Sequence, residues 1–319
     1  MKLLNFKNFD ELTSKVKTEK QAINYFLKLR WGNKINPVCP FCNKCGAYNF
    51  KNQNKTFKCK HCNKIYSYKT GTIFENTKIP MRKWFIAIYL FSSHKKGISS
   101  HQLSRDLSIT QKTAWFMLQR IREVMKNDNN NNESGTFEAD EAYIGGSETN
   151  KHSSKKGKDD KVCVFGIVNR NTKQVKAYKV SSNEKDVLLG KIYSNVKDNS
   201  TIFTDSYNGY DDLKKHYNHE FVKHCAGEYN RDKKTKDGRT AYKINTNSIE
   251  GFWSQLKRGI EGIYHWTSKK HIQRYINEFV FRYNTKNKDI YTEITRFNCV
   301  LRNTLNKRLK YSHYHLLIS

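Results

Sequence analysis

Two short pairs of cysteines constrain this chain more than any other feature of its sequence. Cys39-Pro-Phe-Cys42 and Cys59-Lys-His-Cys62 repeat one C-x-x-C spacing, and sixteen residues separate the two pairs. Each pair presents two sulfur atoms from one tight turn, and Zn²⁺ takes four such ligands at the corners of a tetrahedron. Four thiolates leave no position open to water, so we predict a structural zinc site rather than four unrelated core cysteines. Its ligands are Cys39, Cys42, Cys59 and Cys62.

The balance of charge indicates the class of partner. Among 319 residues, 59 Lys and Arg oppose 29 Asp and Glu, which leaves a net charge of +30. A surface this basic attracts polyanions, because contacts with phosphates release counterions from a nucleic acid. The alternative is a surface tuned only for solubility, but the excess is large and spread along the whole chain. We therefore expect a nucleic acid as partner.

The apolar pattern argues against membrane insertion and secretion. A membrane span needs about 18 consecutive apolar residues, and the longest candidate is the stretch Trp84–Phe91. The N-terminal stretch meets polar residues too early for a secretion signal. We expect a cytoplasmic, nucleoid-associated protein with no membrane partner, in which the cysteines stay reduced and available to a metal.

Changes in composition and periodicity divide the chain into six segments. They are a helical lead-in at 1–30, a zinc ribbon at 31–80, a helix-turn-helix at 81–126, a polar linker at 127–134, an α/β domain at 135–290 and a helical tail at 291–319. Within the α/β domain we expect strands at 136–145, 162–168, 174–180, 200–205 and 220–224, and helices at 184–196, 246–259 and 268–284. Ser181 and Glu184 are expected to form a capping box in front of the first of these helices.

The segment Ile98–Met125 has the pattern of two helices joined by a short turn. Ser100 is placed to cap the first, which would run to about Leu107, and Thr110 is placed to cap the second. In the helix-turn-helix motif, the second helix lies in the major groove of DNA. The residues at its leading edge, and hence the expected DNA contacts, are Gln111, Lys112 and Thr113. The alternative is a small helical bundle that only connects two domains.

The positions of three acidic residues, on two strands and a late helix, predict one metal site. Asp140 lies in the first strand of the α/β domain, and Asp205 ends the fourth. Strand alternation puts Glu138 on the face of Asp140 and turns Glu141 away from it. Glu250 lies in the helix at 246–259. One such carboxylate alone would more simply be a solvated residue, so the prediction depends on the order of the elements that carry the three acids. That β-β-β-α-β-(β)-α order is the RNase H-like arrangement, a mixed sheet flanked by helices.

The helix at 246–259 is amphipathic. Its apolar residues gather on one arc, while Asn247, Glu250 and Lys257 share the opposite one. Phosphodiester transfer uses two divalent ions about 4 Å apart, and Mg²⁺ prefers hard oxygen ligands. Two aspartates and a glutamate supply such oxygens, and a lysine beside them suits a phosphate as a point charge.

The chain closely resembles the insertion-sequence transposases of the IS1595 class, also called ISXO2-like. The resemblance rests on the C-x-x-C pair and on the stretches GTIFENTKIPMRKWF, EADEAYIGG, TDSYNGY, NTNSIEGFWSQLKRGIEGIYH and HIQRYINEFVFRYN, and it extends from about residue 20 to 285. It implies a DDE transposase in which Asp140, Asp205 and Glu250 bind two Mg²⁺ or Mn²⁺ ions. Lys257 would accompany them. Some relatives have an asparagine in place of the third acid, which makes Asn247 an alternative ligand; a carboxylate binds Mg²⁺ better than an amide, which favours Glu250.

The resemblance also implies partners and a reaction. The protein would bind double-stranded DNA, both the terminal inverted repeats of its own element and the target, as a homo-oligomer that brings two ends together. It would hydrolyse a phosphodiester bond at each end and join the freed 3′-hydroxyl to target DNA. Basic residues from the end of the helix at 246–259 onward, interleaved with aromatic residues, are expected to contact the DNA backbone; the alternative is a solvated helix face. The residues of this basic patch are Arg258, Arg274, Arg282 and Lys269.

Two other functions remain open at this point. The first is a non-catalytic regulator, a zinc-ribbon and helix-turn-helix DNA-binding protein derived from a transposase. The second is an RNase H-type or junction nuclease, which shares the acidic site but cuts DNA without joining it. Metal-dependent cleavage separates the first from an enzyme, and joining of the cut end separates the second from a transposase.

Overall fold

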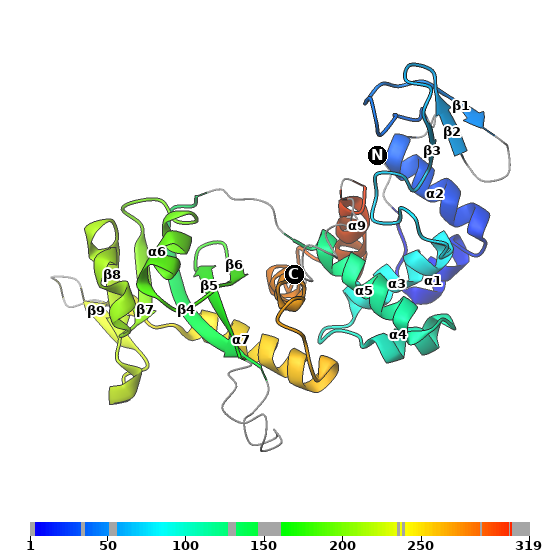
Figure 1. Ribbon diagram of the computed structural model, residues 1–319. Helices are drawn as coiled ribbons and strands as arrows, with labels where there is room; N and C mark the ends of the chain where they lie inside the picture. The colour runs from blue at the N-terminus through cyan, green and yellow to red at the C-terminus, as the bar shows by residue number, and fades with distance from the viewer. Residues whose placement is uncertain are drawn as a thin grey trace, which may run out of the picture. The chain divides into compact units, whose positions relative to one another are not determined.

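The computed structural model describes residues 4–32, 36–50, 56–126, 132–145, 161–234, 237, 240–287, 289–305 and 307. The chain divides into two compact units, one built from residues 1–125 and 287–319 and the other from residues 126–286 (Figure 1). Most of the linker expected at 127–134 lies outside the described residues. Glu133, near its end, pairs with Val196 in an isolated parallel bridge of the second unit.

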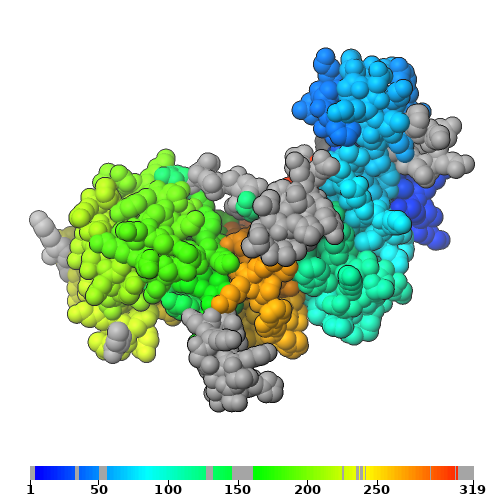
Figure 2. All heavy atoms as spheres, in the orientation of Figure 1, coloured from blue at the N-terminus to red at the C-terminus, as the bar shows by residue number. Residues whose placement is uncertain are grey.

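The first unit combines helices from both ends of the chain with a small sheet. Its elements are α1 (Phe9–Lys15), α2 (Glu19–Trp31), β1 (Ala47–Phe50), β2 (Thr56–Cys59), β3 (Ile65–Ser67), α3 (Met81–Ser93), α4 (Ser100–Leu107), α5 (Gln111–Val124) and α9 (Glu293–Asn303). The strands form an antiparallel sheet in the order β1-β2-β3. In Figure 2 the residues around this sheet (blue) form a compact group of atoms.

Helix α9 completes the core of the first unit although it comes from the far end of the chain. It packs on α3. The ring of Phe297 lies edge-on to that of Phe6, with centroids 5.2 Å apart, and Asn298 Nδ2 donates to the carbonyl oxygen of Leu4 at 3.0 Å. The sequence indicates a helical tail at 291–319, but its amphipathic pattern does not say which unit it packs against.

Helices α4 and α5 follow the pattern expected from the sequence, with one shift. The residue that caps α4 is Ser99, whose side chain accepts from the backbone N–H of Gln102, so the expectation of Ser100 was one residue late. Thr110 caps α5 as predicted, accepting from the backbone N–H of Thr113 at 3.3 Å. Helix α3 contains the longest apolar stretch, and no helix among the described residues is both long and apolar enough to span a membrane.

The second unit is built on a mixed five-stranded sheet. Its elements are β4 (Thr136–Ile144), β5 (Val162–Asn169), β6 (Gln174–Lys179), α6 (Lys185–Tyr193), β7 (Thr201–Asp205), the 3-10 helix η3 (Asn208–Lys215), β8 (Asn218–Val222), the 3-10 helix η4 (His224–Ala226), β9 (Arg231–Lys234), β10 (Thr240–Ile244), α7 (Asn247–Gly259), the π-helix η5 (Ile260–Tyr264) and α8 (Ile272–Asn284). The sheet order is β6-β5-β4-β7-β8. Strands β4, β5 and β6 are successively antiparallel, whereas β4, β7 and β8 run parallel.

Three details of this unit differ from the sequence prediction. Helix α6 begins after Glu184, and no side chain caps it, so the predicted capping box of Ser181 and Glu184 is wrong. Helix α8 begins at Ile272, four residues later than expected. The hairpin of β9 and β10 was not predicted, because its charged residues show no apolar alternation: all four residues of β9 are exposed.

The two faces of the sheet are covered by different helices. One core cluster joins alternate residues of β4, among them Ala142 and Ile144, to the apolar stripes of α7 and α8. The other joins Phe137 and Ala139 of the same strand to α6 and η3. Strand β5 lies between β4 and β6 and is buried along its whole length. The alternation of β4 therefore decides which helices each of its acidic residues meets.

The outer edge of the sheet is covered by side-chain amides of α8. Asn284 accepts from the N–H of Val175 at 2.7 Å and donates to its carbonyl oxygen at 2.9 Å. Gln273 accepts from the N–H of Lys179 at 2.7 Å and donates to the carbonyl oxygen of Ala177 at 3.2 Å. These bonds occupy the backbone positions that a further strand would use, and they attach α8 to β6.

Candidate functional site

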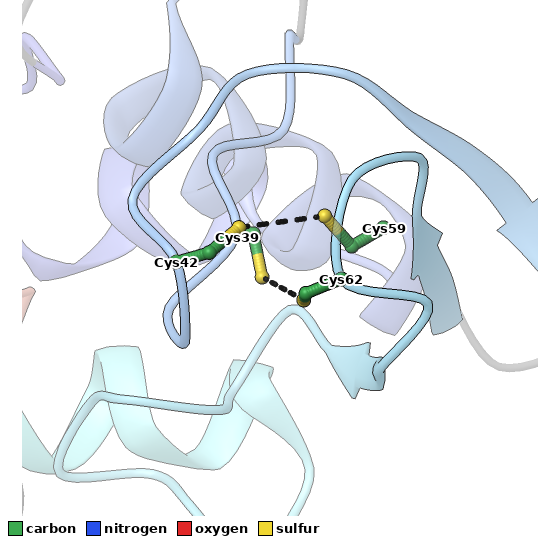
Figure 3. A group of neighbouring side chains, drawn as sticks. All are labelled: Cys39, Cys42, Cys59 and Cys62. Atoms are coloured by element: carbon green, nitrogen blue, oxygen red, sulfur yellow. Dashed lines mark hydrogen bonds between the residues drawn. The ribbon is translucent and has the colours of Figure 1, made fainter.

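The four predicted zinc ligands lie together in the first unit (Figure 3). Their Sγ atoms are all within 4.8 Å of one another, and the pairs Cys39–Cys62 and Cys42–Cys59 are each 3.6 Å apart. A tetrahedron of Zn–S bonds of about 2.3 Å has sulfur atoms about 3.8 Å apart, so the cluster fits a Zn²⁺ ion closely. Cys45 is exposed and lies outside the group.

The turn that follows each cysteine pair explains why the two pairs converge. Asn43 and Asn63 each follow the second cysteine of a pair, and they adopt left-handed backbone conformations with φ of 57° and 55°. Asparagine tolerates this conformation better than most residues. The turns close with matching hydrogen bonds, from Cys39 N to the Lys44 carbonyl oxygen and from Cys59 N to that of Lys64, both 3.0 Å. Each pair is thus presented by the same local structure.

A second group of functional side chains lies at the middle of β4 and at the carboxyl end of β7. The parallel register pairs Thr136 with Thr201 and Glu138 with Phe203. Two residues further along each strand, this register brings Asp140 and Asp205 side by side on the same face. Asp205 also accepts from the N–H of Tyr207 at 3.1 Å, which fixes its carboxylate at the turn after β7.

Asp140 is held in an environment that opposes its charge. Burial is the main cause, followed by repulsion from Glu141 and Asp205; together they raise the pKa of Asp140 from 3.8 to about 7, against the lowering effect of a hydrogen bond from Trp253. Trp253 Nε1 donates to Asp140 Oδ2 at 2.9 Å. The indole lies directly over Gly166, where a Cβ atom would come within 2.7 Å of it, so the glycine allows this contact.

The raised pKa of Asp140 predicts a pH-dependent stability in magnesium-free buffer. Between about pH 4 and pH 7 the native state keeps a proton that the unfolded chain loses, so stability falls as the pH rises through this window. At about 1.36 kcal/mol for each tenfold change in proton affinity, the cost above pH 7 is at most about 4 kcal/mol. Asp140→Asn removes the charge and keeps the Trp253 bond. We expect the variant to be more stable than the wild type at pH 8 and close to it at pH 4.

Chemical denaturation measures this difference. Variant and wild type are compared at each pH, because protonation of the cysteines at pH 4 weakens zinc binding in both. The matched control is Asp198→Asn, because the Asp198 side chain is 70% exposed. The control variant should follow the wild type at both pH values. An Asp140→Asn variant that shows no gain at pH 8 would contradict the buried, repelled state of this carboxylate.

Glu141 belongs to the same carboxylate cluster, which the sequence did not indicate. Strand alternation turns it to the face opposite Asp140, as predicted, and there it accepts a hydrogen bond from the hydroxyl of Tyr210, a buried residue of η3. Burial and repulsion from Asp205 raise the pKa of Glu141, while the Tyr210 bond lowers it. Asp140, Glu141 and Asp205 are thus close enough to repel one another, and we call these three residues the carboxylate cluster.

Glu138 anchors α7 to the sheet. Its buried carboxylate accepts from the N–H groups of Ser248 and Ile249, at 2.7 and 3.0 Å, in the first turn of α7. Arg170 donates to the other oxygen at 2.6 Å and to the carbonyl oxygen of Asn245 at 2.8 Å, just before the helix. A carboxylate at a helix N-terminus satisfies free N–H groups and suits the helix dipole. Glu138 and Arg170 thus set the position of α7 beside Asp140.

The predicted residues on α7 lie on one exposed face, as its amphipathic pattern indicates: Asn247, Glu250 and Lys257 are all exposed. Glu250 Oε1 accepts from Thr246 Oγ1 at 2.8 Å and lies 3.6 Å from Nε2 of His224. Among the described residues, only the four cysteines have ligand atoms all within 4.8 Å of one another. The structure thus brings Asp140 and Asp205 together but directs the Glu250 carboxylate to Thr246 and His224.

Comparison with protein families decides what kind of chain this is. Residues 133–284 match the ISXO2-like transposase domain, and residues 17–65 match the transposase zinc-ribbon domain of the same class. The chain thus contains the transposase domain and the zinc ribbon of the ISXO2-like class. The first match contains the carboxylate cluster and α7, and the second contains all four cysteines.

The chain is also similar to individual proteins. A protein of Halobacterium salinarum, described as an uncharacterized protein in transposable element ISH50, is 26% identical over 285 residues, which are 83% of this chain and 90% of that one. Among solved structures, a cryo-electron microscopy structure of the simian T-cell lymphotropic virus intasome in complex with PP2A regulatory subunit B56 gamma contains a chain that is 11% identical, with a TM-score of 0.26, over 59% of this transposase and 66% of that chain.

The residues expected to contact DNA have different surroundings in this transposase. In α5, Gln111 and Lys112 are exposed and Thr113 is partly buried; Gln111 donates to Ser100 of α4 at 2.8 Å, which ties the first turns of the two helices together. Arg258 is exposed on α7. Arg274, in contrast, is only 8% exposed.

The basic patch predicted around α8 therefore needs correction. Arg282 is 7% exposed and donates to the buried carboxylate of Glu278, at 2.9 Å from Nε and 2.7 Å from Nη2. Arg274 and Arg282 lie on the side of α8 that packs into the unit, among apolar residues of the core. A sequence pattern of alternating basic and aromatic residues does not distinguish an exposed basic face from such buried positions.

Proposed function

We propose that this chain is a DDE-type DNA transposase that binds the terminal inverted repeats of an insertion sequence, cuts a DNA strand at each end and transfers it to target DNA. The observation that carries the proposal is the closeness of Asp140, in the middle of β4, to Asp205, at the carboxyl end of the parallel strand β7: the two carboxylates repel each other. Both residues lie within a domain of a transposase family. The order β6-β5-β4-β7-β8, with the first strand of the domain at its centre, is in keeping with an RNase H-like domain.

The carboxylate cluster fits divalent metal ions on the chemistry of its donors. Asp140 and Asp205 offer only hard oxygens, and their mutual repulsion is the kind of charge that a cation relieves. Two Mg²⁺ or Mn²⁺ ions would support the attacking and leaving oxygens of an in-line displacement. Asp140 and Asp205 would hold them, with Glu250 or Asn247 as the third ligand from α7. Trp253 would orient the Asp140 carboxylate, and Lys257 would hold a DNA phosphate by its charge.

The first unit would recognise DNA. Helices α4 and α5, joined by a short turn and tied together by Gln111 and Ser100, support a helix-turn-helix that presents Gln111, Lys112 and Thr113 to the major groove. The proposal uses the six segments that the sequence predicts as the domains of the protein. Because two element ends must meet, the active form would be a homo-oligomer, acting on DNA at the nucleoid.

One observation favours a second candidate, the non-catalytic regulator. Glu250 bonds to Thr246 and lies near His224, and the three predicted acids do not share one cluster. A regulator would keep the zinc ribbon and the helices and would need no third ligand.

A cleavage and joining assay separates the candidates. The full-length, zinc-loaded protein is incubated with a duplex oligonucleotide that ends in the terminal repeat of its element, together with supercoiled target DNA. We expect nicked end and joined product with Mg²⁺ or Mn²⁺ and neither without a divalent ion. Binding without cleavage in either ion would favour the regulator, and cleavage without joining would favour a nuclease.

A further inference from the structure

A basic cavity lies at the edge of the sheet away from β8. It has a volume of about 280 Å³ and is lined by β6 together with parts of α6 and α8. Its polar lining is dominated by ammonium and amide groups. These belong to Lys126, Lys176, Lys179, Lys191, Gln273 and Asn277. None of these residues belongs to the carboxylate cluster or to the predicted DNA contacts.

The lysines of the cavity are held in place by their neighbours. Lys176 Nζ lies 3.0 Å from a carboxylate oxygen of Glu133, and Lys179 Nζ donates to the carbonyl oxygen of Lys269 at 3.1 Å. Lys191 Nζ lies 5.1 Å from the centre of the Tyr178 ring, a cation–π contact. Because these contacts already restrict the lysine side chains, a ligand that binds them causes a smaller loss of side-chain entropy.

The α8 amides shape the wall of the cavity. Gln273 is fixed to the edge of β6 by its two backbone hydrogen bonds, and it donates to Asn277 Oδ1 at 2.8 Å. The helix therefore stands beside the strand at a set distance instead of closing over the lysines. The cavity is a feature of the fold and does not depend on one mobile side chain.

The composition of the cavity indicates an anionic ligand. The lining contains four lysines and neither Asp nor Glu, and Glu133 forms an ion pair with Lys176, so the positive charge of the lining exceeds the negative. Small-molecule pockets usually measure about 300–1,000 Å³, and this cavity lies just below that range. It suits a phosphate group that belongs to a larger molecule better than an entire cofactor.

We propose that this cavity binds a backbone phosphate of the DNA on which the transposase acts, outside the site of cleavage. The inference rests on the proposed function. The sheet register aligns Asp140 with Gly166 and Gly166 with Ala177 of β6, so the cavity strand lies two strands away from the carboxylate cluster. Two strand spacings amount to about 10 Å. One DNA strand carries a phosphate about every 3.4 Å along the axis, so a duplex at the carboxylates has phosphates at this separation.

The test is the salt dependence of DNA binding by the full-length, zinc-loaded protein, measured by fluorescence anisotropy with a labelled duplex. The pocket variant is Lys176→Gln, Lys179→Gln and Lys191→Gln in one chain. The slope of log affinity against log salt falls by about 0.9 for each phosphate that is no longer neutralised, so loss of the one phosphate in the cavity should lower the slope by about 1. We expect at least a tenfold loss of affinity at about 0.15 M salt. Lys191→Gln alone should lower the slope by less than the triple variant does.

The control removes the same charge elsewhere on the same unit. Lys173, Lys197 and Lys214 are exposed and do not line the cavity, so their triple replacement with Gln should leave the slope close to that of the wild type. Equal slopes for pocket and control variants would overturn the inference. A second measurement is the unfolding temperature with inorganic phosphate at constant ionic strength. If phosphate raises this temperature for the wild type but not for the pocket variant, while the DNA slopes stay equal, the site binds free phosphate and the inference is also overturned.

The outcome is separable from that of the proposed function. If the wild type cuts DNA and the pocket variant keeps its slope, only the cavity assignment fails. If the slope falls as expected but the wild type neither cuts nor joins DNA, the transposase reaction fails and the phosphate site stands.

Discussion

Asp140→Asn is expected to abolish DNA cleavage and strand transfer while leaving binding to the element end nearly unchanged. In the proposed site this carboxylate holds a metal ion, and an amide of the same shape cannot balance the charge of the ion. Loss of a catalytic metal contact worth about 4 kcal/mol of transition-state stabilisation corresponds to a rate loss of about a thousandfold. Because Trp253 donates to Asp140 and can donate equally to the amide oxygen of asparagine, the fold around the site should be kept. The measurement is the rate of nicking of a labelled end duplex in Mg²⁺, with end binding measured in parallel.

Matched variants make the result specific. Asp205→Asn should behave like Asp140→Asn, because the register places the two carboxylates side by side. Asp198→Asn, on an exposed side chain, should cut at the wild-type rate. Glu250→Gln and Asn247→Ala then show which residue of α7 is the third ligand. Wild-type cleavage by Asp140→Asn would remove Asp140 from the site and, with it, the basis of the proposed reaction.

The parts of this site that follow from sequence are those set by local periodicity. The alternation of β4 predicted that Glu138 and Asp140 share a face and that Glu141 does not, and the structure agrees. The helical period of α7 separated its buried stripe from Asn247, Glu250 and Lys257 in the same way. Both patterns depend only on the geometry of a single element, which the chain carries in its own order of residues.

What the sequence did not predict depends on contacts between elements. Tyr210 meets Glu141 only because η3 packs against the sheet, and Arg170 meets Glu138 only because the turn after β5 lies beside α7. The burial of Arg274 has the same cause, since it depends on how α8 packs. None of these partners is near the other in sequence, so no spacing indicates them. The β9–β10 hairpin lacked apolar alternation and was missed for that reason.

The second large effect is expected from loss of the zinc site. The strands of the first unit's sheet have only four, four and three residues, too few to be stable alone. The zinc ribbon contacts α2 in two ways. The ring centroids of Trp31 and Phe57 lie 5.1 Å apart. Arg30 donates to the carbonyl oxygens of Tyr68 and Thr70, both at 2.6 Å. Structural zinc contributes about 10–16 kcal/mol to the folding of comparable small domains.

Cys39→Ser is therefore expected to lose stoichiometric zinc and to unfold residues 36–50 and 56–67 while the carboxylate cluster keeps its structure. Cys39 is fully buried, and serine offers no thiolate, so the variant keeps only three of the four sulfur ligands. Zinc content per chain and hydrogen exchange resolved by peptide measure the two effects: exchange in 36–50 and 56–67 should become fast, and exchange in the strands β4, β5, β6 and β7 should not change. Cys45→Ser is the matched control, because Cys45 lies close in sequence but is exposed and outside the cluster. One zinc per chain in Cys39→Ser, or none in Cys45→Ser, would mean that the four cysteines assigned here are not the ligand set.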